Sequence, residues 1–592
     1  MCGFGGQLTL DGTRPDTEAV SRMSPSLHPR GPDGFGLWTQ GTLALIHHRL
    51  KIIDLSDAGS QPMVDDDLRL VIVFNGCIYN YRQLRGELEG MGYSFRSQSD
   101  TEVILKAYHR WGTRCVERFQ GMFAFALHEL DSGRLILARD RVGIKPLYIA
   151  QSPGRIRFAS TLPALLAAGG VDTAVDRVAL HHYLSWHSIV PAPRTILSGV
   201  RKLPPATVRT IEPNGETSDL HYWEAPAIRE EGVSRSPEEW QEQVLEVLRK
   251  AVAKRMVADV PVGVLLSGGL DSSLIVALLA DAGQSDLATF SIGFSAAGGE
   301  TGDEFKFSDF MAQEFDTKHY KIRIENSRLI SGIDAAVAAM SEPMVSHDCV
   351  AFYLLSEVVA RHVKVIQSGQ GADEIFGGYH WFGEFAGVPR DEAASVFSRA
   401  FVDRSSEEMA ALVSPDWLAD GDPSEAFLSD HFARPGAETA LDAALRMDNA
   451  VMLADDPVKR VDNMTMAWGL EARVPFLDHE LVELAAKCPP ELKLAEGGKG
   501  VLKAASRGVV PDPIIDRQKG YFPVPGVRHL EGHILGLVRD ALTAPAALDR
   551  GFFRPGVVEE LLRDPNGQRT TTGVNVLWQV GLLELWLQRM DV

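Results

Sequence analysis

Cysteine is scarce in this chain, and the few cysteines are not grouped. The 592 residues include five: Cys2, Cys77, Cys115, Cys349 and Cys488. Their number is odd, their spacing is wide and no Cys-x-x-Cys pair occurs, which argues against a disulfide framework and against a zinc site. We therefore expect a protein of a reducing compartment.

Long apolar runs and clusters of basic residues are missing as well. No run reaches the roughly 18 apolar residues of a membrane span, and the opening MCGFGG has neither the basic nor the apolar part of a signal peptide. The net charge is −20 and the pI is about 5.3, with no Lys/Arg cluster to offset it. We expect a cytoplasmic protein without a nucleic-acid or membrane partner, and the length predicts two or three domains.

The most informative segment is residues 260–280, VPVGVLLSGGLDSSLIVALLA. A short apolar run typical of a buried strand is followed by a Ser-Gly-Gly turn and then by apolar residues at helical spacing. Two glycines let the backbone approach a polyphosphate, and the amides and dipole of the helix N-terminus favour negative charge. The alternative is an ordinary buried strand-to-helix turn, in which glycine pairs are common.

SGGLDSS lacks the lysine of a Walker loop and resembles instead the pyrophosphate loop of ATP pyrophosphatases. The resemblance implies cleavage of ATP to AMP and pyrophosphate. It also implies a set of ATP contacts: Leu266, Ser267, Gly268, Gly269, Asp271, Ser272, Ile292, Ser368 and Gly369. Asp271 and Asp373 are the expected Mg²⁺ ligands, although Asp373 can instead cap the helix that follows it.

Further strand-like runs at residues 287–294, 319–324 and 363–367 alternate with helical segments. This βαβα pattern predicts a doubly wound parallel sheet whose ligand lies at the carboxyl ends of the strands, where the strand order reverses. The glycine turn and the loop that begins at Ser368 should therefore lie side by side.

At the other end of the chain, Cys2 follows the initiator Met. Removal of Met1 makes it the N-terminal residue, and an α-amino group with a pKa of about 7.7–8.0 can activate the thiol of its own residue. The context CGFGG, HPRGPDGFG at 28–36, HRL at 48–50, Asn75-Gly76 and SDTE at 99–102 resembles class II glutamine amidotransferases, which release ammonia from glutamine.

This resemblance implies catalytic roles for Cys2, Asn75 and Gly76, the last two as the oxyanion site. It implies glutamine binding by Arg49, Ile53, Asn75, Gly76, Cys77 and Asp100. Arg49 suits the α-carboxylate of glutamine and Asp100 its α-ammonium group. Taken singly, a surface ion pair for Arg49, a turn at Asn75-Gly76 and a helix cap for Asp100 are the simpler readings.

The resemblance predicts an N-terminal nucleophile (Ntn) α/β/β/α sandwich over residues 1–208. Strand-like runs at 70–74, 122–128, 134–138 and 156–159 and helical stretches at 81–91 and 101–111 agree with it. We expect a Pro- and Gly-containing linker at 209–238 and the ATP-pyrophosphatase-type synthetase domain over 239–592.

Residues 448–478, with Ala-, Leu- and Met-rich helical character, and Lys499 in GGKGVLK complete the pattern. Residues 1–530 or so resemble the glutamine-hydrolysing asparagine synthetase family. That implies a catalytic Lys499, which neutralises charge during adenylation, ATP and Mg²⁺ as cofactors, and passage of ammonia from Cys2 to an acyl-AMP. Glutamine, ATP and a small carboxylate are the expected partners, and the resemblance leaves room for a homodimer.

Three positions depart from asparagine synthetases: Cys77 and Gln370 replace glutamates, and His347 replaces an arginine. These variants resemble N-acetylglutaminylglutamine amidotransferases, so His347 and Gln370 are the expected acceptor-site residues and a blocked dipeptide is the expected acceptor. Aspartate, with asparagine as product, is the alternative. A glutamine phosphoribosyltransferase would need a different loop in place of SGGLDSS, and an inactive regulator would be expected to lose Cys2 or Asp271.

Overall fold

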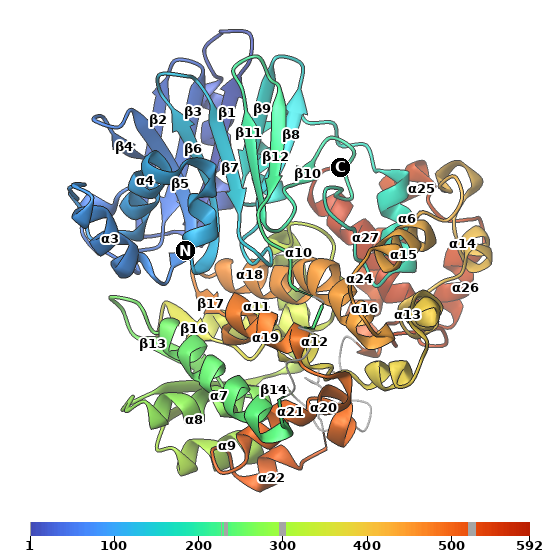
Figure 1. Ribbon diagram of the computed structural model, residues 1–592. Helices are drawn as coiled ribbons and strands as arrows, with labels where there is room; N and C mark the ends of the chain where they lie inside the picture. The colour runs from blue at the N-terminus through green and yellow to red at the C-terminus, as the bar shows by residue number, and fades with distance from the viewer. Residues whose placement is uncertain (1, 227, 230–234, 295–302, 519–527) are drawn as a thin grey trace.

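The computed structural model describes residues 2–226, 228–229, 235–294, 303–518 and 528–592. The chain forms two domains, one built on a pair of antiparallel sheets and one on a parallel sheet surrounded by helices (Figure 1). Within the described ranges, every helix is too short or too polar to cross a bilayer.

Two six-stranded antiparallel sheets face each other in the first domain. The first has the order β10-β8-β9-β1-β3-β2 and the second β12-β11-β7-β6-β5-β4. Their bounds are β1 (Cys2–Thr9), β2 (Gly34–Gln40), β3 (Leu43–Arg49), β4 (Met63–Asp65), β5 (Leu70–Ile78), β6 (Gly121–Glu129), β7 (Leu135–Arg139), β8 (Tyr148–Ser152), β9 (Arg155–Ala159), β10 (Arg201–Lys202), β11 (Thr207–Ile211) and β12 (Thr217–His221). Alternate residues of both sheets, such as Phe4, Val73 and Phe158, fill the space between them with fully buried or nearly buried side chains.

Helices cover the outer faces of this sandwich. Helices α1 (Thr17–Arg22), α2 (Ser24–Leu27) and α5 (Leu162–Ala168) pack on the first sheet, and α3 (Tyr81–Gly90) and α4 (Asp100–Trp111) form the layer on the second. The predicted α/β/β/α sandwich is confirmed, and each predicted strand and helix of this domain falls on an observed one.

The first domain extends beyond the expected boundary at residue 208. Strands β11 and β12 pair with each other and β11 pairs with β7, so the sheet ends at His221, inside the segment expected to be a linker. The turn residues of EPNGETSD misled the prediction, because they form a hairpin turn within the sheet rather than a connection between domains.

The second domain contains a five-stranded parallel sheet of order β15-β14-β13-β16-β17. Its strands are β13 (Val262–Leu265), β14 (Ala288–Phe294), β15 (Lys318–Ile324), β16 (Val365–Gln367) and β17 (Glu471–Arg473). The strand order reverses between β13 and β16, as a doubly wound sheet requires. Four of the strands were predicted; β17 was not, because it lies in a stretch that reads as helix.

The remaining chain is helical. The bounds are α6 (Arg177–Ser185), α7 (Pro237–Lys254), α8 (Leu270–Asp281), α9 (Phe305–Glu314), α10 (Asn326–Ala339), α11 (Asp348–Val359), α12 (Ala372–Phe376), α13 (Ala393–Phe401), α14 (Ser406–Leu412), α15 (Pro423–Ala433), α16 (Ala440–Met447), α17 (Leu453–Asp455), α18 (Pro457–Met466), α19 (His479–Lys487), α20 (Pro490–Leu494), α21 (Gly500–Ser506), α22 (Asp512–Ile515), α24 (Gly532–Thr543), α25 (Pro545–Arg550), α26 (Val557–Arg563) and α27 (Val576–Arg589). Helix α27 packs on α24 and α10, and the indole N–H groups of Trp578 and Trp586 donate to the carbonyls of Val345 and Met340, each at 3.0 Å. The C-terminal segment therefore supports the residues that follow α10.

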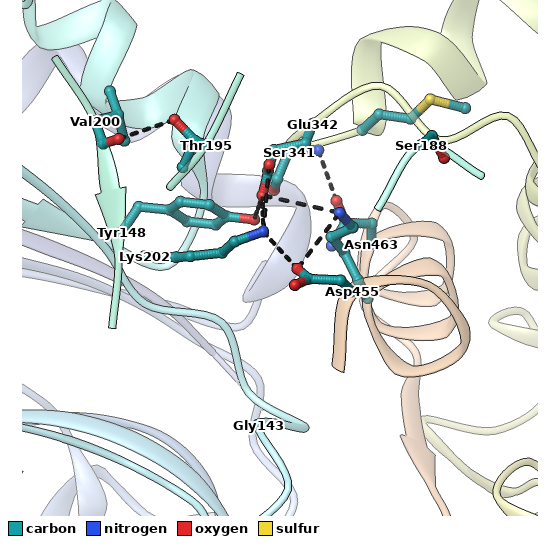
Figure 2. Close-up of polar contacts among 12 residues, drawn as sticks. Gly143, Tyr148, Ser188, Thr195, Val200, Lys202, Ser341, Glu342, Asp455 and Asn463 are labelled. Carbon is teal, nitrogen blue, oxygen red and sulfur yellow. Dashed lines mark hydrogen bonds and ion pairs between the residues drawn. The ribbon is translucent and has the colours of Figure 1, made fainter. Parts of the chain in front are cut away.

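Buried ion pairs join the two domains. The Lys202 ammonium of the first domain lies 3.1 Å from Glu342 and 2.5 Å from Asp455 of the second (Figure 2). Asp462 of α18 pairs with Arg30 at 2.9 Å and with Lys145 at 3.1 Å, and all three side chains are at most 4% exposed. Since a buried charge without its partner is costly, these pairs fix how the domains are placed on each other.

Candidate active sites

Cys2 lies in a small pocket at the end of the sandwich. Sheet register places it directly opposite Arg49 of β3. The pocket has a volume of about 30 Å³ and is lined by Cys2, Arg49, Leu50, Ile52, Ile53, Gly59, Gln61, Phe74, Gly76, Cys77, Ser99, Asp100, Thr101, Glu471 and Arg473. Every predicted glutamine-binding residue except Asn75 lines this pocket together with Cys2. Asn75 is not part of the lining but is hydrogen-bonded to Cys2.

Asn75 holds the main-chain nitrogen of Cys2. Its side-chain oxygen accepts a hydrogen bond from that nitrogen at 3.1 Å. Its Nδ2 is fully buried and has no hydrogen-bond partner among the described residues. A buried amide donor without an acceptor is costly unless a ligand supplies one, so Nδ2 is suited to receive the oxyanion of a tetrahedral intermediate.

The neighbouring Gly76 lies in mid-strand, not in a turn, with φ of +155°. A Cβ atom at this position would lie 2.2 Å from the carbonyl oxygen of Met122. Only glycine fits here, and Gly76 lines the same pocket as Cys2.

Arg49 and Asp100 provide charges of opposite sign. Arg49 donates to the carbonyls of Ile53, Asp54 and Ser56, and no carboxylate of the described chain lies within ion-pair distance of it. Asp100 accepts from the backbone N–H of Ile78 at 3.0 Å, and burial raises its pKa to about 6. The helix cap is Ser99, not Asp100, so the simpler reading of Asp100 does not apply.

Burial raises the pKa of the Cys2 thiol, and the positive charge of Arg49 opposes this increase only in part. The thiol is therefore protonated at neutral pH in this environment and needs a base to become nucleophilic. The α-amino group that forms when Met1 is removed is the nearest candidate, since Asn75 already holds that nitrogen.

The second domain closes this pocket through β17, which sequence reasoning missed. Arg473 lies 3.8 Å from the Cys77 sulfur through Nη2 and pairs with Glu471, and both charged side chains are at most 1% exposed. The carbonyl of Arg473 also accepts from the N–H of Ser368 at 2.9 Å, which ties the glutamine pocket to the predicted ATP loop. Oppositely charged residues two apart in an otherwise apolar segment, EARVPF, were the available signal.

The second candidate site is a cavity of about 620 Å³ at the carboxyl ends of β13 and β16. The predicted ATP contacts Leu266, Ser267, Gly269, Asp271, Ser272, Ile292, Ser368 and Gly369 all line it, with Gln370, Asp373 and Lys499. Hydrogen bonds within the glycine turn preorganise it: Ser267 Oγ accepts from Gly269 N at 3.3 Å and lies 3.1 Å from Ser272 Oγ. Gly268 is not part of the lining. Its φ is +74°, a Cβ atom at this position would clash with Phe307, and its carbonyl accepts a hydrogen bond from Arg517 at 2.9 Å.

Lys499 bridges the two predicted metal ligands. Its ammonium lies 2.7 Å from Asp271 and 2.8 Å from Asp373. Burial opposes the charge of Lys499, but the two carboxylates more than offset it and raise its pKa. The lysine is charged, and the two carboxylates converge on one position.

This donor set fits Mg²⁺ that arrives with a nucleotide. Mg²⁺ commonly takes one or two carboxylates together with phosphate oxygens and water, and Asp271 and Asp373 already converge on a single cation. Among the described residues no group of three or more acidic, histidine or cysteine side chains forms a self-sufficient metal centre. The remaining ligands would therefore come from the phosphates.

Not every predicted residue lies in the cavity. His347 is the residue before α11 and is absent from the lining, whereas the next residue, Asp348, is part of it. Sequence reasoning also missed Arg517, which pairs with Glu304 at 2.7 Å and closes over the glycine turn. The pair Asp516-Arg517 after an apolar run was its only signal.

Comparison with known proteins agrees with the geometry of both sites. Residues 1–223 match the glutamine amidotransferase domain and residues 243–588 match the asparagine synthase family. The chain belongs to the asparagine synthase family. Asparagine synthetase [glutamine-hydrolyzing] 1 of Bacillus subtilis is 30% identical over 99% of this chain and 96% of its own length.

Two further members of the family are similar over most of their length. Asparagine synthetase [glutamine-hydrolyzing] 3 of Bacillus subtilis is 32% identical over 88% of this chain and 87% of its own. A putative asparagine synthetase [glutamine-hydrolyzing] of Mycobacterium tuberculosis is 32% identical over 86% of this chain and 84% of its own. The match to the amidotransferase domain ends at residue 223, close to the end of β12.

Proposed function

We propose that this chain is a carbon–nitrogen ligase that hydrolyses glutamine at Cys2 and uses the ammonia to amidate a carboxylate activated by ATP. The observation that supports the proposal is that the chain holds two separate clusters of the expected residue types. One holds Cys2, Asn75 and Asp100; the other holds the glycine turn with Lys499 between Asp271 and Asp373.

At the first site, Arg49 and Asp100 would hold the α-carboxylate and α-ammonium groups of glutamine. The Cys2 sulfur would attack the side-chain amide, its proton passing to the α-amino group, while Asn75 Nδ2 and the Gly76 N–H stabilise the oxyanion. Ammonia leaves with that proton, and water later releases glutamate from the thioester.

At the second site, the α8 N-terminus and the glycine turn would hold the β and γ phosphates. Attack of the acceptor carboxylate on the α-phosphorus then gives an acyl-adenylate and pyrophosphate. Bound Mg²⁺ would neutralise charge on the phosphates during this step. Lys499 stays charged, so it can stabilise the negative charge that develops on pyrophosphate and later on AMP as each leaves. Ammonia then displaces AMP from the acyl-adenylate.

For the acceptor, we favour a blocked dipeptide such as N-acetylglutaminylglutamine over aspartate. Aspartate carries an α-ammonium and an α-carboxylate that need partners in a closed site. Gln370, which lines the cavity, is neutral and therefore cannot pair with either of these charges. Amide groups of a blocked dipeptide match the donor and acceptor of Gln370.

The acceptor test measures pyrophosphate release under saturating ATP and Mg²⁺, with ammonium as nitrogen source and either N-acetylglutaminylglutamine or aspartate. The expected result is faster release with the dipeptide, and a relative gain for aspartate in Gln370→Glu. Efficient turnover of aspartate with no response to the dipeptide would instead support asparagine synthesis, while release with neither would reject a ligase acting on these acceptors.

A further inference from the structure

A second cavity lies between the two domains, away from both active sites. Its volume is about 240 Å³, and it shares no lining residue with either site. One wall is formed by the end of β7, by the two loops that contain Pro191 and Pro205, and by the segment around Trp223. Helices α12, α15, α16 and α19 (Figure 1) contribute the other wall. Most of the lining is apolar.

Basic residues outnumber acidic ones in the cavity wall. Arg139, Arg141 and Arg446 line it, and each is at most 9% exposed. Their hydrogen bonds go to backbone carbonyls, and within the described ranges no carboxylate lies within ion-pair distance of any of them. Of the three acidic residues of the wall, Asp442 is paired with Arg229 and Asp455 with Lys202, whereas Glu224 has no ion pair within the described ranges.

Four lining side chains have buried polar atoms without a hydrogen-bond partner among the described residues: Arg141 and Arg446 at Nε, His431 at both ring nitrogens and Asn449 at Oδ1. His431 is 1% exposed, and neither of its ring nitrogens has a hydrogen-bond partner among the described residues. The same holds for Nε of Arg446, whose side chain donates to the carbonyl of His431 through Nη2 at 3.0 Å. Native proteins satisfy nearly all buried polar groups, so two such groups side by side are suited to bind a ligand or an ordered water.

We propose that this cavity binds a small organic monocarboxylate with an apolar body. The carboxylate would pair with Nε–H of Arg446 and with the N–H of His431, and the Pro, Ala and Trp223 surfaces would cover the apolar part. Burial and the nearby arginines lower the pKa of His431 to about 3, so it is neutral and offers one donor and one acceptor. A cation would be repelled by the uncompensated arginines.

Such a ligand would contact the synthetase site through α12. Ile375 of α12 lines the cavity, and Asn449, which also lines it, donates to the carbonyl of Glu374 at 3.4 Å. The preceding residue, Asp373, is paired with Lys499.

Ligand-observed NMR on the full chain tests the proposal with benzoate, phenylacetate and isovalerate, each beside its neutral amide. Saturating AMP and glutamate exclude binding at the two active sites. At least one acid should bind, and at least tenfold more tightly than its amide. If none of the three acids binds, or if acid and amide bind equally, the proposal is wrong.

Two variants locate the binding. His431→Phe removes the unpartnered nitrogens and should weaken acid binding at least tenfold while the ligand-free protein keeps or gains thermal stability; His431→Gln should retain part of the affinity. Ala225→Phe, which fills the cavity without removing a charge, should also weaken binding, and Arg563→Gln on exposed α26 should not. Unchanged acid binding in both cavity variants, with folding confirmed by ammonium-dependent synthesis, would contradict the site.

Discussion

Replacement of Asn75 by alanine tests the proposed oxyanion site. Asn75 makes one hydrogen bond to the Cys2 nitrogen and holds one buried amide donor without a partner. Loss of an oxyanion donor raises the barrier by about 2.7–4 kcal/mol, and loss of the hydrogen bond that orients the amine adds about 1 kcal/mol. The sum, about 4 kcal/mol or more, corresponds to a loss of roughly 10³-fold in glutaminase kcat.

The assay is glutamate release by protein whose chain begins at Cys2, beside pyrophosphate release with ammonium as nitrogen source. Asn75→Ala should lose the first activity and keep the second within about twofold, since the synthetase cavity shares no residue with the glutamine pocket. Asn75→Asp keeps the acceptor and loses the donor, so it should be impaired to a similar degree. A glutaminase loss below tenfold would refute the oxyanion role, and an equal loss of both activities would show a structural one.

The remaining predictions concern charge. Burial raises the pKa of Asp100 to about 6, so its carboxylate is lost as the pH falls through that value, and KM for glutamine should rise between pH 7 and 5.5 in wild type; a flat wild-type profile would contradict ammonium binding by Asp100. Lys499→Met should lower synthesis at least 100-fold with glutamine or ammonium and leave glutaminase activity unchanged, because the Lys499 ammonium pairs with Asp271 and Asp373 of the synthetase site; retained synthesis would remove it from the catalytic set. Asp462→Ala leaves Arg30 and Lys145 buried without a carboxylate and should lower the free energy of unfolding by about 3–5 kcal/mol. Asp219→Ala, which breaks an exposed pair with Arg209, should lower it by less than about 1 kcal/mol. Similar melting temperatures for the two variants would show that the domain interface does not depend on the ion pairs of Asp462.

The parts of the fold that follow local periodicity were predictable from sequence. Strand β13 and helix α8 around SGGLDSS, and the alternating segments of the sandwich, follow apolar spacing closely. The end of the first domain was misplaced, because hairpin turns and linkers use the same Gly, Pro and Asn residues. Strand β17 was missed, since a three-residue strand has no measurable period and depends on pairing with β16.

The site residues divide in the same way. Cys2, Asn75 and Asp100, and likewise Asp271 and Lys499, belong to recognisable motifs, and the structure brings each group together. Glu471 and Arg473 lie about 400 residues from Cys77 in sequence, and only tertiary packing places them in the glutamine pocket. His347 shows the converse: it was predicted to lie in the acceptor site, but its neighbour Asp348 lines the cavity and His347 does not.

The central claim is that glutamine nitrogen reaches a carboxylate activated by adenylation in the same chain. The most direct measurement supplies amide-¹⁵N-labelled glutamine, ATP, Mg²⁺ and the acceptor, and determines the nucleotide products together with the label in the amidated product. We predict AMP, pyrophosphate and glutamate in equal amounts, with ¹⁵N in the new amide, and loss of that label in Cys2→Ala unless labelled ammonium is added. Formation of ADP and phosphate, or an amide product without glutamine-derived ¹⁵N in wild type, would contradict the account.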